Sequence, residues 1–146
     1  QGCPGMKIVD HTGKTSPGGA GTKQGSELRQ WPVQLKLLSP EAPYFKNADL
    51  VIAADCVPFS FPDFHDRFLK DKVLVVFCPK LDNSYEEYVE KLSTIFKTNN
   101  IKSVTIVHME VPCCTGTTAT IEEALKRAGV NTIIKDYTIS LQGDII

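Results

Sequence analysis

The stretch Val104-Thr-Ile-Val-His-Met-Glu-Val-Pro-Cys-Cys-Thr-Gly-Thr-Thr118 predicts a buried strand that turns directly into a helix. Its first four residues are all β-branched, which is typical of a strand that is covered on both faces. The apolar run ends at a proline, two adjacent cysteines and a glycine, and a helical pattern begins there. Cys113 and Cys114 therefore lie at a predicted corner between a strand and a helix.

The same arrangement occurs twice earlier in the chain. The apolar run Leu50–Ala54 is followed by Cys56, the run Val73–Phe77 is followed by Cys78, and a proline comes shortly after each cysteine. Neighbouring parallel strands place their carboxyl ends on one edge of a sheet, which is where open α/β sheets bind their ligands. We therefore expect four thiols from three strands to converge at one edge.

Strand and helix patterns alternate along the remainder of the chain. Apolar residues at helical spacing predict helices over 62–69, 85–98 and 118–128, while alternating or apolar runs predict strands over 33–37, 50–54, 73–77, from 103 onward, and 132–139. Such alternation predicts parallel strands joined by right-handed crossovers. The expected fold class is α/β, a three-layer sandwich with a mainly parallel sheet of four or five strands and helices on both faces. Trp31 is expected to anchor the core.

The first 27 residues differ in composition from the remainder. Residues 6–25 are rich in glycine, lysine, threonine and serine, which predicts a flexible surface loop after a turn at Cys3. We expect residues 1–27 to form this turn and loop, and residues 28–146 to form the α/β domain. Gly13-Lys14-Thr15 is not taken as a phosphate-binding loop, because the earlier glycine of that motif is absent. Since the chain opens on Gln1, we expect it to be a processed piece.

Composition and charge limit the expected partners. A chain of 146 residues with 42% hydrophobic and 23% charged residues has the material for one globular domain. Its formal net charge is -1 and its 16 basic residues are scattered, so we expect neither nucleic acid nor a membrane as partner. No apolar run approaches the roughly twenty residues of a bilayer span, and no signal peptide is visible. The expected location is cytoplasmic.

The cysteines point to metal chemistry. Thiolates gathered at one edge suit an iron–sulfur cluster or a tetrahedral zinc ion. Zinc usually takes ligands in close pairs, whereas 21 residues separate Cys56 from Cys78 and 34 separate Cys78 from Cys113. A cluster spreads its ligand positions over a wider polyhedron than one zinc ion does. The spacing therefore favours a cluster and leaves zinc as the alternative.

Other interpretations of these residues stay open. A metal-free thiol/disulfide oxidoreductase could use the vicinal cysteines, although it would have no use for Cys56 and Cys78. Any single cysteine could be a packed core residue. His108 could be a ligand or a proton carrier, but a packed or surface histidine is favoured. A flavodoxin-like module that binds flavin or phosphate is supported by the fold alone.

Several motifs carry a likeness to a known family, and it spans most of the chain. They are Gly2-Cys-Pro-Gly5, Leu28-Arg-Gln-Trp-Pro-Val-Gln34, Ala42-Pro-Tyr-Phe45, Ala48-Asp-Leu50, Ala53-Ala-Asp-Cys-Val-Pro-Phe59, Cys78-Pro-Lys-Leu-Asp82 and Met109-Glu-Val-Pro-Cys-Cys114. In these motifs the chain resembles the uncharacterised ferredoxin-like [4Fe–4S] proteins of anaerobic bacteria and archaea, which typically carry an amino-terminal ferredoxin module that these residues do not include. The resemblance implies cluster binding and electron transfer.

A second, partial likeness is to the cysteine-rich (CCG) domain of heterodisulfide reductase. It rests on Cys78 and on the pair Cys113-Cys114, but Thr115 stands before the glycine here and a later C-x-x-C is missing. The likeness implies a noncubane cluster or disulfide cleavage only as an alternative.

The residues and the resemblance together predict an iron–sulfur protein, with [4Fe–4S] as the favoured cluster. The predicted ligands are Cys56, Cys78, Cys113 and Cys114, and Cys3 is the reserve cofactor-binding residue if one of the adjacent pair cannot reach. The expected role is electron transfer, or a cluster-based redox step, with a protein partner for which a ferredoxin module is a candidate. The chain would then be a component of an oxidoreductase, and no catalytic residue stands out.

Overall fold

The structure of the chain is a computed structural model that describes residues 3–14 and 25–146. The glycine-rich centre of the predicted flexible loop, residues 16–21, lies outside the described residues. Two short strands on either side of it, β1 (Val9–Asp10) and β2 (Gln30–Trp31), pair with each other in antiparallel fashion. Residues on both sides of the predicted boundary at 27 are thus hydrogen-bonded to one another.

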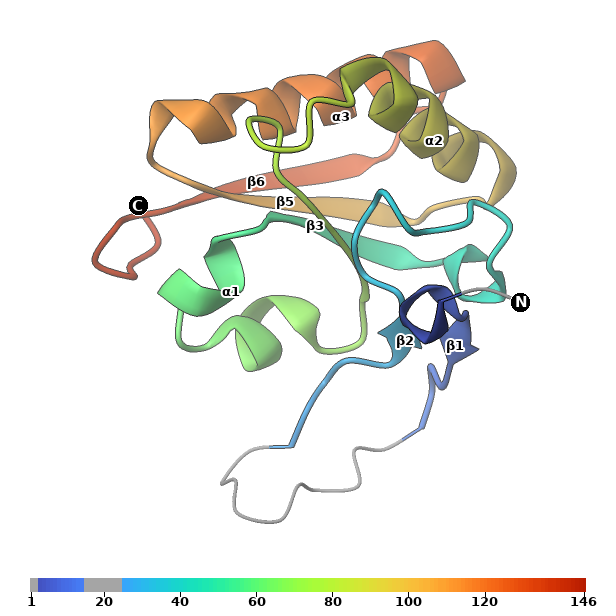
Figure 1. Ribbon diagram of the computed structural model, residues 1–146, viewed down its shortest axis with the longest axis horizontal. Helices are drawn as coiled ribbons and strands as arrows, with labels where there is room; N and C mark the ends of the chain where they lie inside the picture. Colours follow the sequence, from blue (N-terminus) through green and yellow to red (C-terminus); the bar gives the residue numbers. More distant parts are fainter. Residues whose placement is uncertain (1–2, 15–24) are drawn as a thin grey trace.

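The centre of the fold is a four-stranded sheet (Figure 1). Its strands are β3 (Asp49–Ala54), β4 (Val73–Phe77), β5 (Ser103–Met109) and β6 (Ile133–Ile139), in the order β4-β3-β5-β6. All three pairings are parallel, with Ile52 opposite both Val75 and Ile106. Because helices cover both faces of the sheet, β3 and β4 are almost fully apolar and buried, as expected for parallel strands.

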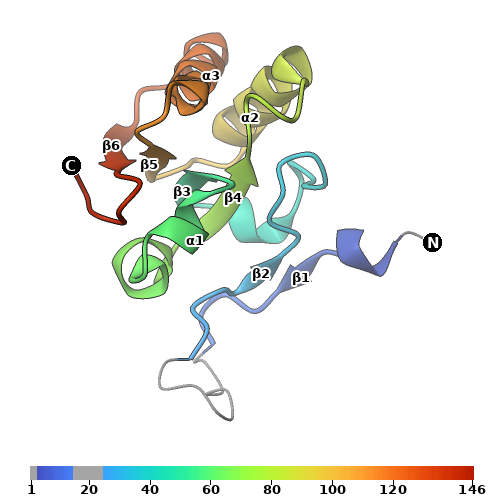
Figure 2. The same ribbon diagram turned by 60° about the vertical axis from the view of Figure 1, so that its left-hand side comes forward.

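Helices cover both faces of this sheet, which confirms the predicted three-layer α/β sandwich. Figures 1 and 2 show α2 (Tyr85–Thr98) and α3 (Thr115–Ala128) on one face and α1 (Val57–Ser60) on the other. A short π-helix, η3 (His65–Leu69), packs beside α1 through Phe68 and Leu69. The apolar stripe of α2 is buried against the sheet, as its helical spacing predicts: Tyr88, Val89, Leu92, Ile95 and Phe96.

Three local predictions differ from the structure. The strand predicted over 33–37 is reduced to a single bridge between Gln34 and Val76, because the chain then turns so that Leu35 and Leu38 both enter the core. The helix predicted over 62–69 is replaced by α1 and η3. Trp31 is 41% exposed rather than buried, and its indole N–H donates to the carbonyl of Gly5 at 2.7 Å. A search of the described residues for a helix that is long and apolar enough to cross a membrane finds none.

Candidate functional site

The strand order creates a crevice at the carboxyl edge of the sheet. The connection that leaves β3 enters α1 on one face, and the connection that leaves β5 enters α3 on the opposite face. Divergence of this kind between two adjacent parallel strands is where open α/β folds place their ligands. Cys56 follows β3, and a short turn, η4 (Pro112–Cys114), follows β5 with the two adjacent cysteines on it. Cys78 directly follows the neighbouring strand β4.

The four thiols at this edge lie near enough to influence one another. Burial raises the pKa of the Cys114 thiol, a backbone hydrogen bond from Met109 lowers it, and the charges of Cys113, Cys56 and Cys78 raise it further. Repulsion between thiolates acts only over short distances in a salt solution. We call the edge formed by Cys56, Cys78, Cys113 and Cys114 the thiol edge.

The spacing of these thiols decides whether they can bind a single metal ion. Within residues 3–14 and 25–146, no three histidine, cysteine or acidic side chains are grouped closely enough to hold a single metal ion. All five cysteines are free thiols. The thiol edge, as the described residues form it, is therefore not a preassembled metal site.

The two adjacent cysteines have different surroundings. Cys114 is buried with 6% of its surface exposed, whereas Cys113 is exposed. Both belong to the turn η4, in which successive side chains of a 3-10 geometry point about 120° apart. Cys56 is exposed and Cys78 is half-buried, so three of the four cysteines of the thiol edge are at least partly open to solvent.

Cys78 is held in a tight turn that sequence reasoning did not foresee. The N–H of Leu81 donates to Cys78 Sγ at 3.4 Å, and the N–H of Cys78 donates to Asp82 Oδ2 at 3.0 Å. The Tyr88 hydroxyl donates to the same carboxylate oxygen at 2.9 Å. The spacing of four residues between Cys78 and Asp82 in the sequence is the signal that could have identified this turn. The helix N-cap is Ser84, which makes no side-chain capping bond.

A close approach joins this turn to the start of α3. A Cβ atom added to Gly116 would lie 2.9 Å from the Pro79 Cβ, which is closer than real carbon atoms pack. The absence of a side chain at Gly116 therefore lets the Cys78-Pro79 turn approach the helix that begins after Cys114. This contact sets the separation between two of the four thiols.

Two carboxyl groups stand beside the thiols. Asp55 precedes Cys56 and accepts a long hydrogen bond from the Gln34 amide at 3.4 Å. Its pKa is raised by burial and by repulsion from Asp82, and the Gln34 bond partly opposes this rise. The thiol edge thus carries negative charge in addition to sulfur, which favours a cationic over an anionic occupant.

His108 belongs to a separate polar network at the ends of β5 and β6. Its Nε2 lies 2.8 Å from Asp136 Oδ1, and its Nδ1 lies 3.1 Å from the carbonyl oxygen of Met109. Thr118 on α3 donates to the other Asp136 oxygen at 2.7 Å. Both ring nitrogens are engaged with acceptor oxygens, so this geometry favours the packed histidine over the metal ligand.

The structure does not bring Cys3 to the thiol edge. Cys3 precedes the short turn η1 (Pro4–Met6), which Figures 1 and 2 both show at the side of the molecule near β1 and β2, away from α1. Its thiol is exposed, and it is absent from the charges that act on Cys114. As placed here, Cys3 cannot share an occupant with the other four thiols.

Comparison with known proteins agrees with this architecture. A family model described as a Rossmann-like domain matches residues 42–146. The chain is also 34% identical over 119 residues to an uncharacterised protein of Archaeoglobus fulgidus, an alignment that covers 82% of this chain and 83% of that protein. No solved structure matches the chain. The match of the family model across the sheet and its helices shows that the chain belongs to the Rossmann-like domain family.

Proposed function

We propose that the thiol edge holds an iron–sulfur cluster, most simply a [4Fe–4S] cluster, and that the protein uses it to exchange electrons with a protein partner. The observation that carries the proposal is that four free thiols follow the carboxyl ends of three adjacent parallel strands. Cys56, Cys78, Cys113 and Cys114 would hold the cluster, which when bound would supply one-electron redox chemistry. What the chain itself contributes is the placing of these sulfur atoms and of the dipoles around them.

The spread of the thiols favours a cluster over zinc. Four sulfur ligands of one zinc ion must each lie about 2.3 Å from it, which requires a tightly packed set. The cysteines come instead from separate strand ends, with 21 residues between Cys56 and Cys78 and 34 between Cys78 and Cys113, and lack the close pairs that are usual for zinc. A cluster spreads its ligand positions more widely than one zinc ion, so this spacing favours it.

Backbone N–H groups around the sulfur atoms support the thiolate form that would hold the cationic core of such a cluster. Cys78 Sγ accepts a hydrogen bond from Leu81, and the Cys114 thiol receives one from the backbone of Met109. Hydrogen bonds to ligand sulfur atoms stabilise thiolates and tune the reduction potential of clusters. The N-terminus of α3 follows Cys114 directly and adds a favourable dipole.

The surroundings of the vicinal pair argue against metal-free thiol chemistry. Burial raises the pKa of the Cys114 thiol, so the thiolate at this position needs a partner such as a bound metal to stabilise it. The vicinal pair is also divided between a buried and an exposed environment. A dithiol enzyme would gain little from this arrangement.

Exposed apolar side chains next to the thiols support a protein partner. Phe59 is 92% exposed and lies three residues after Cys56, and Leu81 is 79% exposed and lies three residues after Cys78. Large apolar side chains surrounded by solvent are typical of surfaces that contact other proteins. A partner that covers them would bring its own redox centre close to the thiol edge.

The proposal is tested by purifying the full chain without oxygen and measuring iron, sulfide, zinc and the visible absorption spectrum. We expect iron and sulfide in comparable amounts and a broad visible band. The Cys78→Ser variant should lose most of the iron. The matched Cys3→Ser variant should keep it, because the turn η1, which Cys3 precedes, lies away from α1.

Three outcomes would contradict the proposal. Zinc without iron would select the zinc alternative. Colourless, metal-free protein with a vicinal pair that oxidises reversibly would select the thiol/disulfide alternative. Equal loss of iron from the Cys3→Ser and Cys78→Ser variants would show that the iron is bound elsewhere or adventitiously.

A further inference from the structure

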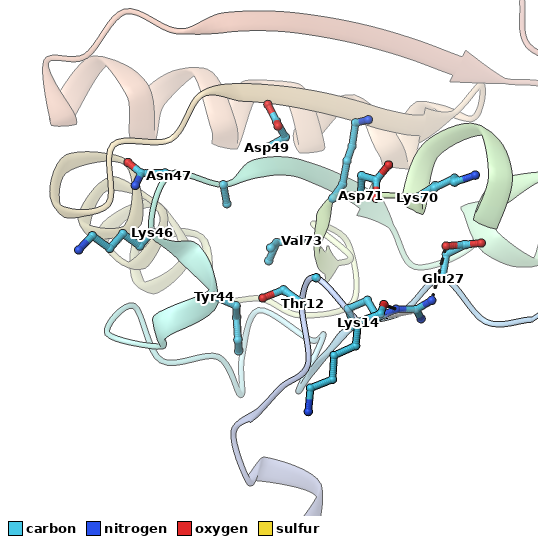
Figure 3. A pocket seen from close by; sticks show the side chains of 14 residues that line it. Thr12, Lys14, Glu27, Tyr44, Lys46, Asn47, Asp49, Lys70, Asp71 and Val73 are labelled. Atoms are coloured by element: carbon cyan, nitrogen blue, oxygen red, sulfur yellow. Dashed lines mark hydrogen bonds and ion pairs between the residues drawn. The ribbon is translucent and has the colours of Figure 1, made fainter. Parts of the chain in front are cut away.

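A cavity of about 570 Å³ opens at the amino edge of the sheet, at the opposite ends of the strands from the thiols (Figure 3). It is lined by the first residues of β3 and β4, Asp49 and Val73, and by the turn that contains Thr12 and Lys14. Its volume is within the range of small-molecule sites in proteins. With six residues in β3, the cavity lies roughly 20 Å from the thiol edge, so it is a separate site.

The lining of this amino-edge cavity is positively charged. Five cationic side chains, which include Lys46, Lys70 and Lys72, face three carboxylates, which leaves an excess of two positive charges. The chain as a whole has a formal net charge of -1, so this excess is local. One arginine and one glutamate of the lining, Arg29 and Glu27, are paired with each other at 3.7 Å.

The lysines are available to a ligand. Among the described residues, no carboxylate forms an ion pair with Lys46, Lys70 or Lys72, whereas Asp49 in the same lining accepts a hydrogen bond from Ser103 at 2.6 Å. Figure 3 shows Lys46 and Lys70 on the rim of the cavity, on opposite sides of an open centre. Long lysine side chains on a rim can fold inward over an anion.

A buried hydroxyl in the lining lacks a partner. Tyr44, from the turn η2 (Pro43–Phe45), is only 4% exposed, and no described residue forms a hydrogen bond with its hydroxyl. The nearby Asp10 carboxylate accepts from the N–H and hydroxyl of Thr12 instead. Buried polar groups without a partner are rare in folded proteins, because each one costs free energy. The Tyr44 hydroxyl oxygen is itself covered by protein atoms, so it marks a strained, polar wall of the cavity and is not a group that a bound ligand contacts directly.

We propose that the amino-edge cavity binds a small molecule that carries a phosphate group. A phosphate group brings two negative charges and several acceptor oxygens, which match the excess positive charge of the lining and the ammonium groups of its lysines. The volume leaves room for more than the phosphate alone, so a nucleotide is the size of ligand that fits. The proposal uses none of the thiols and stands independently of the cluster.

The test is calorimetric titration of the full chain with ATP, inorganic pyrophosphate, inorganic phosphate and citrate as probes. We expect saturable binding of ATP or pyrophosphate at one site per chain. The Lys70→Ala/Lys72→Ala double variant should weaken it about tenfold or more. The matched double variant Lys97→Ala/Lys126→Ala removes the same charge from exposed helix positions and should bind as the parent does.

Binding of ATP but not of pyrophosphate would show that the cavity also recognises the nucleoside. Binding of both would show that the phosphates are the groups recognised. Either result supports the proposal. The absence of saturable binding by all three phosphate probes would overturn it. Equal weakening in the two lysine double variants would show general charge attraction and would also overturn it. Citrate that binds as tightly as ATP would assign the cavity to carboxylates instead.

Discussion

Replacing Gly116 with alanine should separate two of the thiols while leaving the fold in place. The new Cβ would lie 2.9 Å from the Pro79 Cβ, whereas carbon atoms in contact prefer about 3.5 Å or more, so the two segments must part by roughly 0.6 Å. The Pro79 ring is fixed to the backbone and cannot rotate away. The displacement therefore passes to Cys78, its immediate neighbour.

The cost to stability is small because two effects oppose each other. Overpacking costs about 1 to 3 kcal/mol, while alanine is favoured over glycine in a helix by about 1 kcal/mol. The net destabilisation of at most about 2 kcal/mol lowers Tm by roughly 6 °C or less in a chain of this size. By contrast, metal–ligand distances tolerate only about 0.2 Å, so the same displacement should reduce retained iron by more than half.

Iron analysis, thermal unfolding and alkylation of Cys114 followed by mass spectrometry would measure the effect of Gly116→Ala. Opening of the contact should also make Cys114 more accessible to an alkylating reagent, a readout that does not depend on iron. Gly5→Ala is the matched control, because its new Cβ would meet Cys3 Sγ at an ordinary 3.6 Å. A variant with parental iron content and an unchanged alkylation rate would refute the reasoning that this contact fixes the separation of the thiols.

Three other predictions concern the chain without any ligand. Cys114, buried and with a raised pKa, should be alkylated at least about tenfold more slowly than the exposed Cys56, and equal rates measured by peptide mass spectrometry would contradict its placement. Ile106→Ala in the fully buried centre of the sheet should cost about 3 to 4 kcal/mol in chemical denaturation, whereas Ile133→Ala, at a position 65% exposed, should change stability by less than about 0.5 kcal/mol. Burial, with the nearby Asp10 charge, raises the pKa of the Tyr44 hydroxyl to about 12 in the folded protein. The hydroxyl in the unfolded chain therefore loses its proton at lower pH, near 10. The free energy of unfolding should fall by roughly 2 kcal/mol between pH 10 and 12. Tyr44→Phe should remove that part of the alkaline loss in urea titrations, and an unchanged pH profile would show that the hydroxyl is not buried.

The features that could be predicted from the sequence are those encoded by local periodicity. The helix over 85–98 has the predicted bounds, because five apolar residues at helical spacing leave no other way to bury them. The strands that end before Cys56 and Cys78 were predictable for the same reason, since short β-branched runs are bounded by proline. The parallel sheet then followed from the alternation of the elements.

The features that could not be predicted depend on contacts between distant segments. Sheet order is one of them, because the apolar runs of β3, β4 and β5 are alike and no pattern states which strand is central. The exposure of Trp31 is another, since its indole is satisfied by a carbonyl 26 residues away in sequence. The amino-edge cavity could not be predicted from the sequence because its lining comes from four separate segments. Nothing in the sequence around Tyr44 indicates that its hydroxyl lacks a partner.

The strand order also explains why the two proposed sites stand apart and yet share elements. β3 begins with Asp49 in the lining of the cavity and is followed at its other end by Cys56, and β4 likewise runs from Val73 to the residue before Cys78. Both strands are buried and paired along their length, so they hold the sites at a fixed separation. A ligand in the cavity can therefore affect the thiols only by moving β3 or β4. Addition of ATP should leave the alkylation rate of Cys56 unchanged if the strands are rigid, and a changed rate would show that the sheet transmits the binding event.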